Sequence, residues 1–342
     1  MSHGNTRTQQ ARYRSHCTGT GHQICVEQLH SAAAHPVPTP DFDQARLEAA
    51  LFEGLDGTID YCAHPAGIAR TTPSSDHLAL ALDSKLGPKY RLPEHSLGMI
   101  LPTHYTGPEE TENVPGGYVG VRLRAIDDAG LHLGLAGTDA HVTLTGPSTE
   151  EWHEIVAAMR ADCQECHLEP LWDARDLTGP EADYLAREHR WESEKAERAW
   201  LASGLLRRIG LFHTVSKPYS MRYWRHGLGW KFEVRYEHGV AVNHDAVVEH
   251  LTHRRWGMPL QVFRESCACK SCTCDGGAER SCWFTFVGDQ PKTKIIIHFR
   301  QTRAHYDMTD PYDRLTGAGA SRTWLQQALP SHHEQATCPP AS

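Results

Sequence analysis

Five of the eleven cysteines fall within the sixteen residues from 267 to 282, the densest group of metal-binding side chains in the chain. The C-x2-C spacing of Cys269 and Cys272 lets one tight turn direct two sulfurs at one ion. The sequence therefore predicts a structural zinc site, with Cu(I), an iron–sulfur cluster, a redox switch and disulfides as the alternatives for thiol chemistry. The predicted ligands are Cys267, Cys269, Cys272, Cys274 and Cys282.

A second pair of cysteines occurs in the segment Cys163-Gln-Glu-Cys166-His167. It has the C-x-x-C-H form of covalent haem attachment and also matches half of a zinc site. Haem of that kind is attached outside the cytoplasm, and the first residues form no apolar signal segment. Two interpretations are therefore favoured: Cys163 and Cys166 are further ligands of the zinc site, or they are ordinary thiols.

Familiar catalytic signatures are missing from the sequence. It holds no H-E-x-x-H helix, G-x-S-x-G elbow, P-loop or dinucleotide fingerprint. The pairing of H-x-E with P-C-x-x-C that marks zinc deaminases is also missing. The remaining candidates for metal or acid–base chemistry are His244 with Asp245, and His305 with Asp307 and Asp310, but such short clusters arise often in a chain with 24 histidines.

Basic and aromatic residues are interleaved in the segment 219–236, which reads as a β-hairpin around a turn at 227–229. Residues 211–310 carry fourteen Lys and Arg against ten Asp and Glu, a local charge of +4 in a chain of net charge −8. Cations contact phosphates and aromatic rings stack on unpaired bases, so the segment is a candidate for binding nucleic acid. The candidate contacts are Arg222, Arg225, Lys231 and Arg235.

The favoured interpretation of the same hairpin is simpler: it is an ordinary amphipathic element with its aromatic residues in the core. Strand alternation then puts Trp230, Phe232 and Val234 in the core. Lys231 and Arg235 face solvent in either interpretation, where they can reach phosphate.

The composition describes a folded protein without a membrane span. Hydrophobic residues make up 39% of the 342 residues, enough for a real core. No run of about 18 apolar residues occurs. The net charge of −8 argues against coating of nucleic acid by the whole surface. The lack of a signal segment predicts a cytoplasmic protein with reduced thiols.

Two short polar helices are predicted on either side of residues 18–21, near the N-terminus. The pattern Ala11-Arg-Tyr-Arg14, Thr18-Gly-Thr-Gly21 and Leu29 resembles an N-terminal segment of uncharacterised actinobacterial proteins. The resemblance implies a bacterial protein and transfers no activity. A docking segment or a frayed terminus is favoured over a DNA-reading helix-turn-helix, because the helices are short and the turn contains two glycines.

The predicted fold class is α+β, with two lobes joined by one long helix. Each lobe is expected to contain a small antiparallel sheet with a packed helix, and the second lobe to carry a cysteine-rich metal knuckle. The predicted parts are an N-terminal segment with a Pro-rich linker at 1–40, a first lobe at 41–177, a connecting helix at 178–210, a second lobe at 211–329 and a disordered tail at 330–342.

These features predict a zinc-stabilised intracellular binding or regulatory protein that contacts nucleic acid through the hairpin 219–236. One alternative is an enzyme of an unrecognised class with a structural zinc. Another is a thiol-based sensor of metals or oxidants. A protein partner stays open, and no membrane partner is expected.

Overall fold

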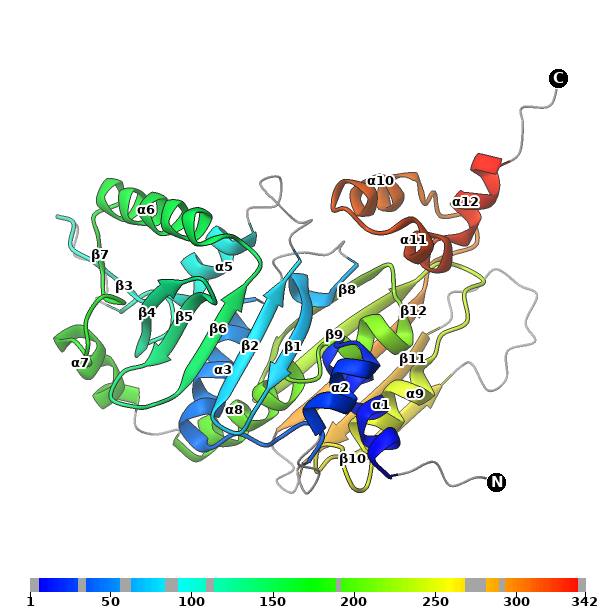
Figure 1. The fold of residues 1–342 in the computed structure, drawn as a ribbon, viewed down its shortest axis with the longest axis horizontal. Coiled ribbons are helices and arrows are strands. Elements are labelled where there is room, and N and C mark those ends of the chain that lie inside the picture. The colour runs from blue at the N-terminus through cyan, green and yellow to red at the C-terminus, as the bar shows by residue number, and fades with distance from the viewer. Residues whose placement is uncertain are drawn as a thin grey trace.

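Two five-stranded sheets with helices packed between them form the core of the computed structural model (Figure 1). A two-stranded sheet of β3 (Thr103–Tyr105) and β7 (Leu168–Pro170) adds to the first half. The α+β class is therefore confirmed. The structure describes residues 6–29, 35–55, 63–83, 92–108, 114–188, 192–267, 281–288 and 293–337. Within these ranges, no helix is both long and apolar enough to cross a membrane.

The first sheet has the strand order β1-β2-β6-β5-β4. All neighbours are antiparallel except β2 and β6, which run parallel with His77 opposite His141. The predicted meander is present in the last three strands, where Leu131 and Leu133 point into the core and are fully buried. The strands are β1 (Ile68–Pro73), β2 (His77–Leu82), β4 (Val121–Asp127), β5 (Gly130–Leu135) and β6 (His141–Thr145).

The second sheet has the strand order β10-β11-β12-β9-β8. Again one central pair, β9 and β12, is parallel, and the other pairs are antiparallel. Both sheets are therefore mixed, and the prediction of purely antiparallel sheets was wrong. The strands are β8 (Ser220–His226), β9 (Gly229–Tyr236), β10 (Gln261–Cys267), β11 (Ser281–Val287) and β12 (Lys294–Gln301).

The two halves of the chain repeat one topology. In each half a helix leads to a β-hairpin, a second helix and a three-stranded meander whose last strand lies parallel to the second strand of the hairpin. A further helix follows each meander. The helices of the first half are α3 (Phe42–Gly54), α5 (Leu92–Ile100) and α6 (Thr149–Glu165), and those of the second are α8 (Glu192–Leu206), α9 (His244–Leu251) and α10 (Thr309–Gly317).

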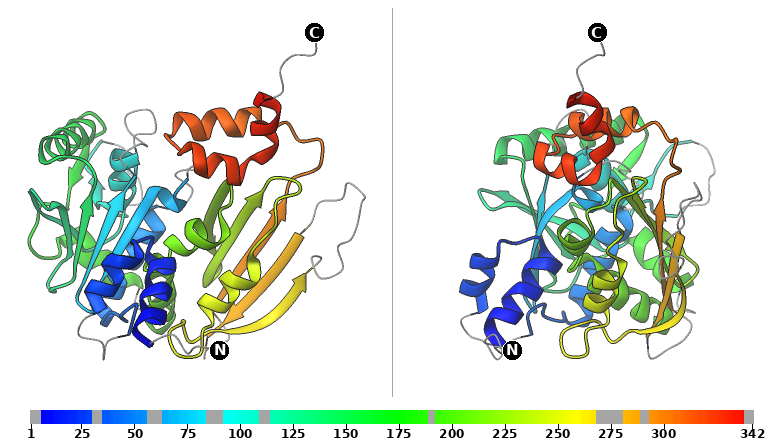
Figure 2. Two further views of the ribbon diagram at one scale, coloured as in Figure 1. Left: turned by 45° about the vertical axis from the view of Figure 1, so that its right-hand side comes forward. Right: turned by 90° about the vertical axis from the view of Figure 1, so that its right-hand side faces the viewer.

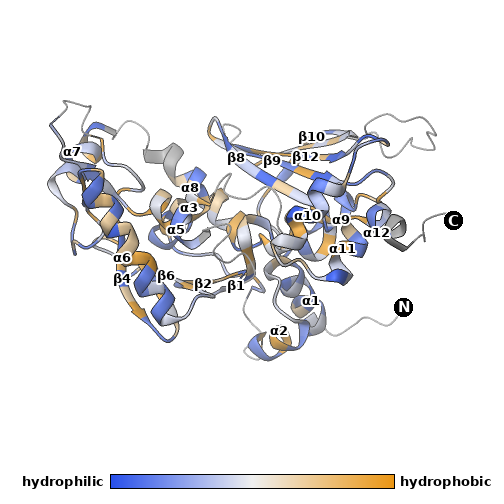
Figure 3. Ribbon diagram, turned by 90° about the horizontal axis from the view of Figure 1, so that it is seen from above, coloured by the Kyte–Doolittle hydropathy of each residue, from blue (hydrophilic) through white to orange (hydrophobic). Residues whose placement is uncertain are grey.

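The first helices of the two repeats, α3 and α8, pack against each other in the middle of the molecule. Seen from above, they lie between the two sheets (Figure 3). Phe52 of α3 reaches the second sheet, where its ring stacks on Tyr223 at 4.2 Å and meets the edge of Trp230 at 4.7 Å. One apolar core therefore runs through both halves.

A buried ion pair stabilises the contact between α3 and the end of α8. The Glu48 carboxylate of α3 accepts two hydrogen bonds from Arg207, which follows α8, at 2.7 and 2.5 Å. Ser203 and Gln44 donate to the same carboxylate at 2.6 and 2.8 Å. Both charged side chains are 0% exposed. The donors around Glu48 compensate for the cost of removing its charge from water.

The first sheet is covered near one edge by α6, whose start matches the sequence signal. Ser148 accepts from the Glu151 amide, and the Glu151 side chain accepts from the Ser148 amide, as the S-x-x-E pattern predicts. Trp152 and Val156 are buried in the common core. This helix contacts β4 and β5 of the meander.

The predicted connecting segment 178–210 contains two helices, α7 (Gly179–Glu188) and α8, and residues 189–191 between them lie outside the described residues. A π-helix, η5 (Phe212–Ser216), follows. The predicted disordered tail contains α12 (Pro330–Thr337). Its remaining residues, 338–342, lie outside the described residues.

The N-terminal segment is docked, as one of the two favoured interpretations expects. It forms α1 (Thr6–Thr18) and α2 (His22–Gln28). The Arg14 guanidinium donates to the carbonyls of Pro36 and Pro73 at 2.6 and 3.2 Å. Gly19 has a φ of +71°, and a Cβ there would lie 2.7 Å from the Ala69 carbonyl oxygen, so this turn needs glycine.

The C-terminal helices lie at the other end of the second half from α1 and α2 (Figure 2, orange to red against blue). These helices are α10, α11 (Arg322–Ala328) and α12. Leu315 of α10 and Trp324 of α11 belong to a small apolar cluster that also includes Ala63 and Tyr219. His213 of η5 lies beneath it. Its Nδ1–H donates to the Ala63 carbonyl, and its ring stacks on Trp324 at 6.1 Å.

Acid should destabilise the protein through His213. Burial, with the nearby His64, lowers the pKa of His213 from 6.5 to about 4. The unfolded chain binds this proton first, so the free energy of unfolding should fall by up to about 3 kcal/mol as the pH drops through this interval. Urea unfolding at pH 7 and pH 4.5 measures the loss. The His213→Asn variant, which keeps a donor for Ala63, should lose less stability on acidification, and an unchanged loss would contradict this assignment.

Candidate nucleic-acid interface

The hairpin β8–β9 separates its apolar residues from its cations. Trp230, Phe232 and Val234 are fully buried and face the central helices, as strand alternation predicts. Lys231 and Arg235 are half-buried on the opposite side. We call that side, the one turned away from α3 and α8, the outer face of the second sheet.

A hollow of about 400 Å³ lies on this outer face. Strands β8 to β12 all contribute to its wall, and Ser266 stands opposite Trp283 in the register of β10 and β11. No carboxylate lines the hollow among the described residues. The lining side chains are two cations, an imidazole, two hydroxyls and two apolar groups: Lys231, Arg264, His226, Ser266, Thr285, Trp283 and Ile296.

Indole rings position the central cation of the hollow. The Lys231 ammonium lies 5.3 Å from the ring centre of Trp224 and 5.0 Å from that of Trp283. The Arg222 guanidinium lies 5.5 Å from the Trp224 ring. His298 stacks on Trp283 at 3.7 Å. Cation–π attraction at these distances offsets part of the free energy that is lost when the Lys231 and Arg222 charges are partly removed from water.

Glu233 is the acidic residue in this part of the outer face. It pairs with Arg235 at 2.6 Å and with Arg222 at 3.6 Å. Burial would raise the pKa of Glu233, but the hydrogen bond from Arg235 and the charges of both arginines outweigh burial and lower it. Arg222 and Arg235 are thus partly neutralised, whereas Lys231 and Arg264 form no ion pair within the described part of the chain.

Arg225 is the predicted contact that the structure does not bring to this face. Arg225 is two residues beyond Tyr223 and four beyond Met221 on β8, so it lies on the same, inward-facing side of the sheet as these two residues. Its charge acts on the Tyr118 hydroxyl, which belongs to the first half of the molecule. Arg264, which the sequence did not single out, takes part instead, because the sheet order brings β10 onto the same face.

The predicted zinc ligands are only partly within the described residues. Cys269, Cys272 and Cys274 fall in 268–280, outside them, so the predicted knuckle is not described. Cys267 and Cys282 are direct partners in the register of β10 and β11, and Cys282 is buried. The described ranges contain no group of three His, Cys, Asp or Glu side chains arranged to hold a metal ion.

Cys163 and Cys166 lie far from that hairpin. They occupy the last turn and the C-cap of α6, at the opposite end of the molecule from β10 and β11 (Figure 1). Cys163 is buried and Cys166 exposed. Burial, with the neighbouring Asp162 and Cys166, raises the pKa of Cys163. The structure therefore does not bring this pair to the predicted zinc site.

The residues predicted for metal or acid–base chemistry, His244 with Asp245 and His305 with Asp307 and Asp310, lie in different local environments. The buried His244 ring packs at 5.1 Å from Phe284 and 5.9 Å from Phe299. Asp307 accepts from the Thr309 amide in a turn, and Asp310 pairs with Arg314 at 2.9 Å. His244 Nδ1 lies 2.9 Å from the Asp245 carboxylate, so this predicted pair is in contact. Asp307 and Asp310 are held by residues of their own turn and helix.

A histidine cluster on the first sheet was missed by sequence reasoning. His132 Nε2 lies 2.8 Å from the Asp127 carboxylate, and its Nδ1 lies 2.8 Å from His141 Nε2. His77 joins through Thr143 at 2.9 Å. Burial lowers the pKa of both His77 and His141. The sequence does contain one signal, because each histidine alternates with buried residues along its strand. It does not show which strands are neighbours in the sheet, so it could not show that the three histidines meet.

Comparison of the chain with known protein families, with curated proteins and with solved structures gives no match. The surface just described therefore has to be interpreted from its own residues. Its chemistry is that of a basic, aromatic sheet face with a hollow whose described lining contains no acidic residue.

Proposed function

We propose that this protein binds single-stranded nucleic acid on the outer face of the second sheet. The observation that supports it most is Lys231, held between two indole rings beside Arg264 in a hollow that no carboxylate of the described residues lines. An uncompensated pair of cations attracts phosphate, and the Ser266 and Thr285 hydroxyls add hydrogen-bond donors. The overall charge of −8 restricts such binding to this face.

Single strands fit this face better than a duplex. Unpaired bases expose their rings, and sheet surfaces that carry aromatic side chains bind them by stacking. Trp224 and Trp283 are half-buried on neighbouring parts of the face. When Lys231 turns to a phosphate, it uncovers ring surface on both indoles for stacking.

Fluorescence anisotropy of a labelled single-stranded oligonucleotide tests this proposal. We expect binding at low salt that weakens as salt rises, because neutralised phosphates release their counterions. The same oligonucleotide in a duplex should bind more weakly. Absence of binding at low salt, or affinity that salt does not change, would remove the proposal.

We also propose that zinc closes the loop between β10 and β11, with four ligands drawn from Cys267, Cys269, Cys272, Cys274 and Cys282. The pairing of Cys267 with Cys282 supports this, since residues opposite each other on antiparallel strands have Cα atoms about 4.5–5.5 Å apart. Cys282 is also next to Trp283, a wall of the hollow. A metal there would fix one border of the proposed binding face.

Protein purified without added metal should contain about one zinc ion per chain by elemental analysis. The double variant Cys269→Ser with Cys272→Ser should lose it and lower the melting temperature. Cys166→Ser, at the other end of the molecule, is the matched control and should leave zinc content unchanged. A metal-free, normally melting wild-type protein would contradict the zinc proposal, and disulfides found by thiol titration would support the redox alternative.

A further inference from the structure

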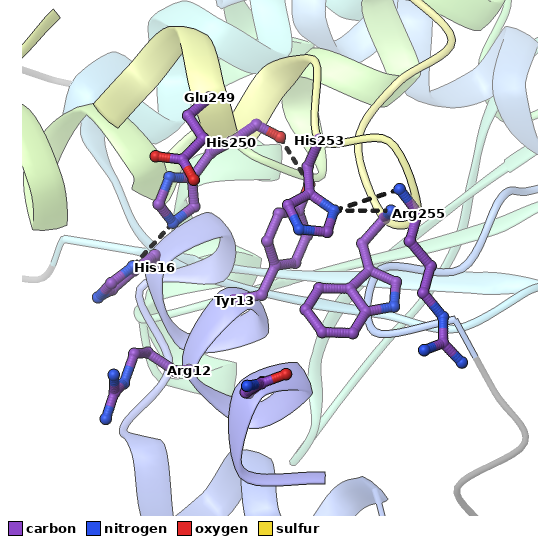
Figure 4. Close-up of a pocket in the computed structure, with 9 residues that line it drawn as sticks. Arg12, Tyr13, His16, Glu249, His250, His253 and Arg255 are labelled. Atoms are coloured by element: carbon purple, nitrogen blue, oxygen red, sulfur yellow. Dashed lines mark hydrogen bonds between the residues drawn. The ribbon is translucent and has the colours of Figure 1, made fainter. Parts of the chain in front are cut away.

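A second hollow, of about 460 Å³, lies between α1 and α9, away from the outer face (Figure 4). Aromatic and imidazole rings form its walls. Tyr13 is central: its ring stacks on His250 at 5.5 Å and is tilted against His253 at 5.5 Å and Trp256 at 5.6 Å. His253 stacks on Trp256 at 4.8 Å. A volume of several hundred Å³ with largely aromatic walls is typical of small-molecule sites.

The docking of α1 makes this hollow a preformed one. The Tyr13 hydroxyl donates to the His250 carbonyl at 2.8 Å. The Thr214 hydroxyl donates to the His16 carbonyl at 2.7 Å, which ties the end of α1 to η5. Tyr13 and Cys17 of α1 form a buried apolar cluster with Val37 and Trp256. The N-terminal segment thus has a defined place, and four of its side chains, those of Gln9, Arg12, Tyr13 and His16, line a ligand-sized space.

Hydrogen bonds fix the protons on the histidines of the hollow. His250 Nδ1 lies 2.7 Å from the Ala246 carbonyl, so it carries the proton and leaves Nε2 as an acceptor. His16 Nδ1, 2.9 Å from that Nε2, must then donate. Burial lowers the pKa of both rings, so they stay neutral near pH 7. His16 is left with an unprotonated Nε2.

His253 has the opposite arrangement. Its Nδ1 accepts from the backbone amides of Arg255 and Trp256 at 3.3 and 3.2 Å, so its proton is on Nε2. The hollow therefore offers one imidazole acceptor, on His16, and one imidazole donor, on His253. Such a pair matches the mixed donor and acceptor edge of a nucleobase.

Two exposed arginines stand at the rim. Arg12 and Arg255 both line the hollow, and the Arg255 guanidinium lies 5.8 Å from the Trp256 ring. Glu249 is the single carboxylate among the described lining residues, and Gln9 contributes an amide. Guanidinium groups bind phosphate through paired hydrogen bonds, and a carboxylate suits ribose hydroxyls.

We propose that this hollow is a binding site for a mononucleotide, with the base against the Tyr13, His253 and Trp256 rings and the phosphate on one of the two arginines, Arg12 or Arg255, which lie on opposite sides of the hollow (Figure 4). This site is separate from the outer face, because α9 packs on the inner side of β11 and β12 through His244. It does not depend on the proposed binding of single-stranded nucleic acid.

Calorimetric titration of the full chain tests the site with the four ribonucleoside 5′-monophosphates as probes. At least one should bind tenfold more tightly than its nucleoside and than inorganic phosphate. The double variant Arg12→Gln with Arg255→Gln should weaken that nucleotide at least tenfold and leave the nucleoside unchanged. The matched control is Arg254→Gln, an exposed neighbour that does not line the hollow, and it should have no effect.

A second variant distinguishes this hollow from the outer face. Lys231→Ala with Arg264→Ala should leave nucleotide affinity unchanged. Loss of nucleotide binding in that variant would place the nucleotide on the outer face and overturn the proposal. So would the absence of heat with all four nucleotides at millimolar concentration, or inorganic phosphate binding as tightly as the nucleotide.

Discussion

Replacement of both Lys231 and Arg264 by alanine should weaken the binding of a single-stranded oligonucleotide on the order of a hundredfold at low salt. Each side chain supplies one charge-assisted contact to phosphate, and the loss of such a contact costs about 1.5 kcal/mol or more, roughly tenfold in affinity. Neither cation has an ion-pair partner in the described part of the chain, so both charges are available to the ligand.

The salt dependence of binding gives an independent readout for the same variant. Two fewer phosphate contacts should reduce the slope of log affinity against log salt by about 1.4 for a single strand. Arg225→Ala removes an exposed cation from the same strand pair but not from the outer face, so it should change neither affinity nor slope. Equal losses in the two variants would contradict the assignment of binding to this face.

Removal of the Glu48 carboxylate should produce the largest loss of stability. The Glu48→Ala variant leaves Arg207 buried without its partner at the contact between α3 and α8. Breaking a buried ion pair from one side costs about 3–5 kcal/mol. Because α3 and α8 join the two repeats, the loss should appear in global unfolding by urea, monitored by tryptophan fluorescence.

Two further variants separate the ion pair from ordinary helix effects. Asp43→Ala on the same helix removes an exposed pair with Arg46, whose side chains are 45% and 42% exposed, and should cost less than about 1 kcal/mol. Replacing Glu48 by Leu together with Arg207 by Met should recover much of the loss, since an apolar pair leaves no uncompensated charge. A loss below 1 kcal/mol in Glu48→Ala would contradict the role given to this pair.

Elements with a strong local pattern could be predicted from the sequence. The capping box at Ser148 and Glu151 begins a helix, and the hairpin alternation buries Trp230 and leaves Lys231 outside. These signals depend on residues close together along the chain. The parallel pairs β2–β6 and β9–β12 join strands about sixty residues apart in the chain, which no local pattern reveals. The repeated topology was hidden for the same reason.

Prediction of the candidate sites was limited for the same reason, because they join residues that are far apart in the chain. The basic character of the hairpin could be recognised from composition, but not the addition of Arg264 and Trp283, which depends on the order of the strands. The hollow between α1 and α9 joins Tyr13 to His250, 237 positions apart. For the predicted zinc site, the pairing of Cys267 with Cys282 agrees with a loop closed at its base, while the three central cysteines lie outside the described residues.

Photo-crosslinking of the full chain to a single-stranded oligonucleotide carrying 4-thiouridine, followed by mass spectrometry, tests the central claim most directly. We expect crosslinks in peptides that contain Trp224, Lys231 and Trp283, and their loss in the Lys231→Ala, Arg264→Ala variant. Crosslinks confined to the first sheet, or none under conditions in which the oligonucleotide is bound, would contradict the claim that the outer face of the second sheet is the binding surface.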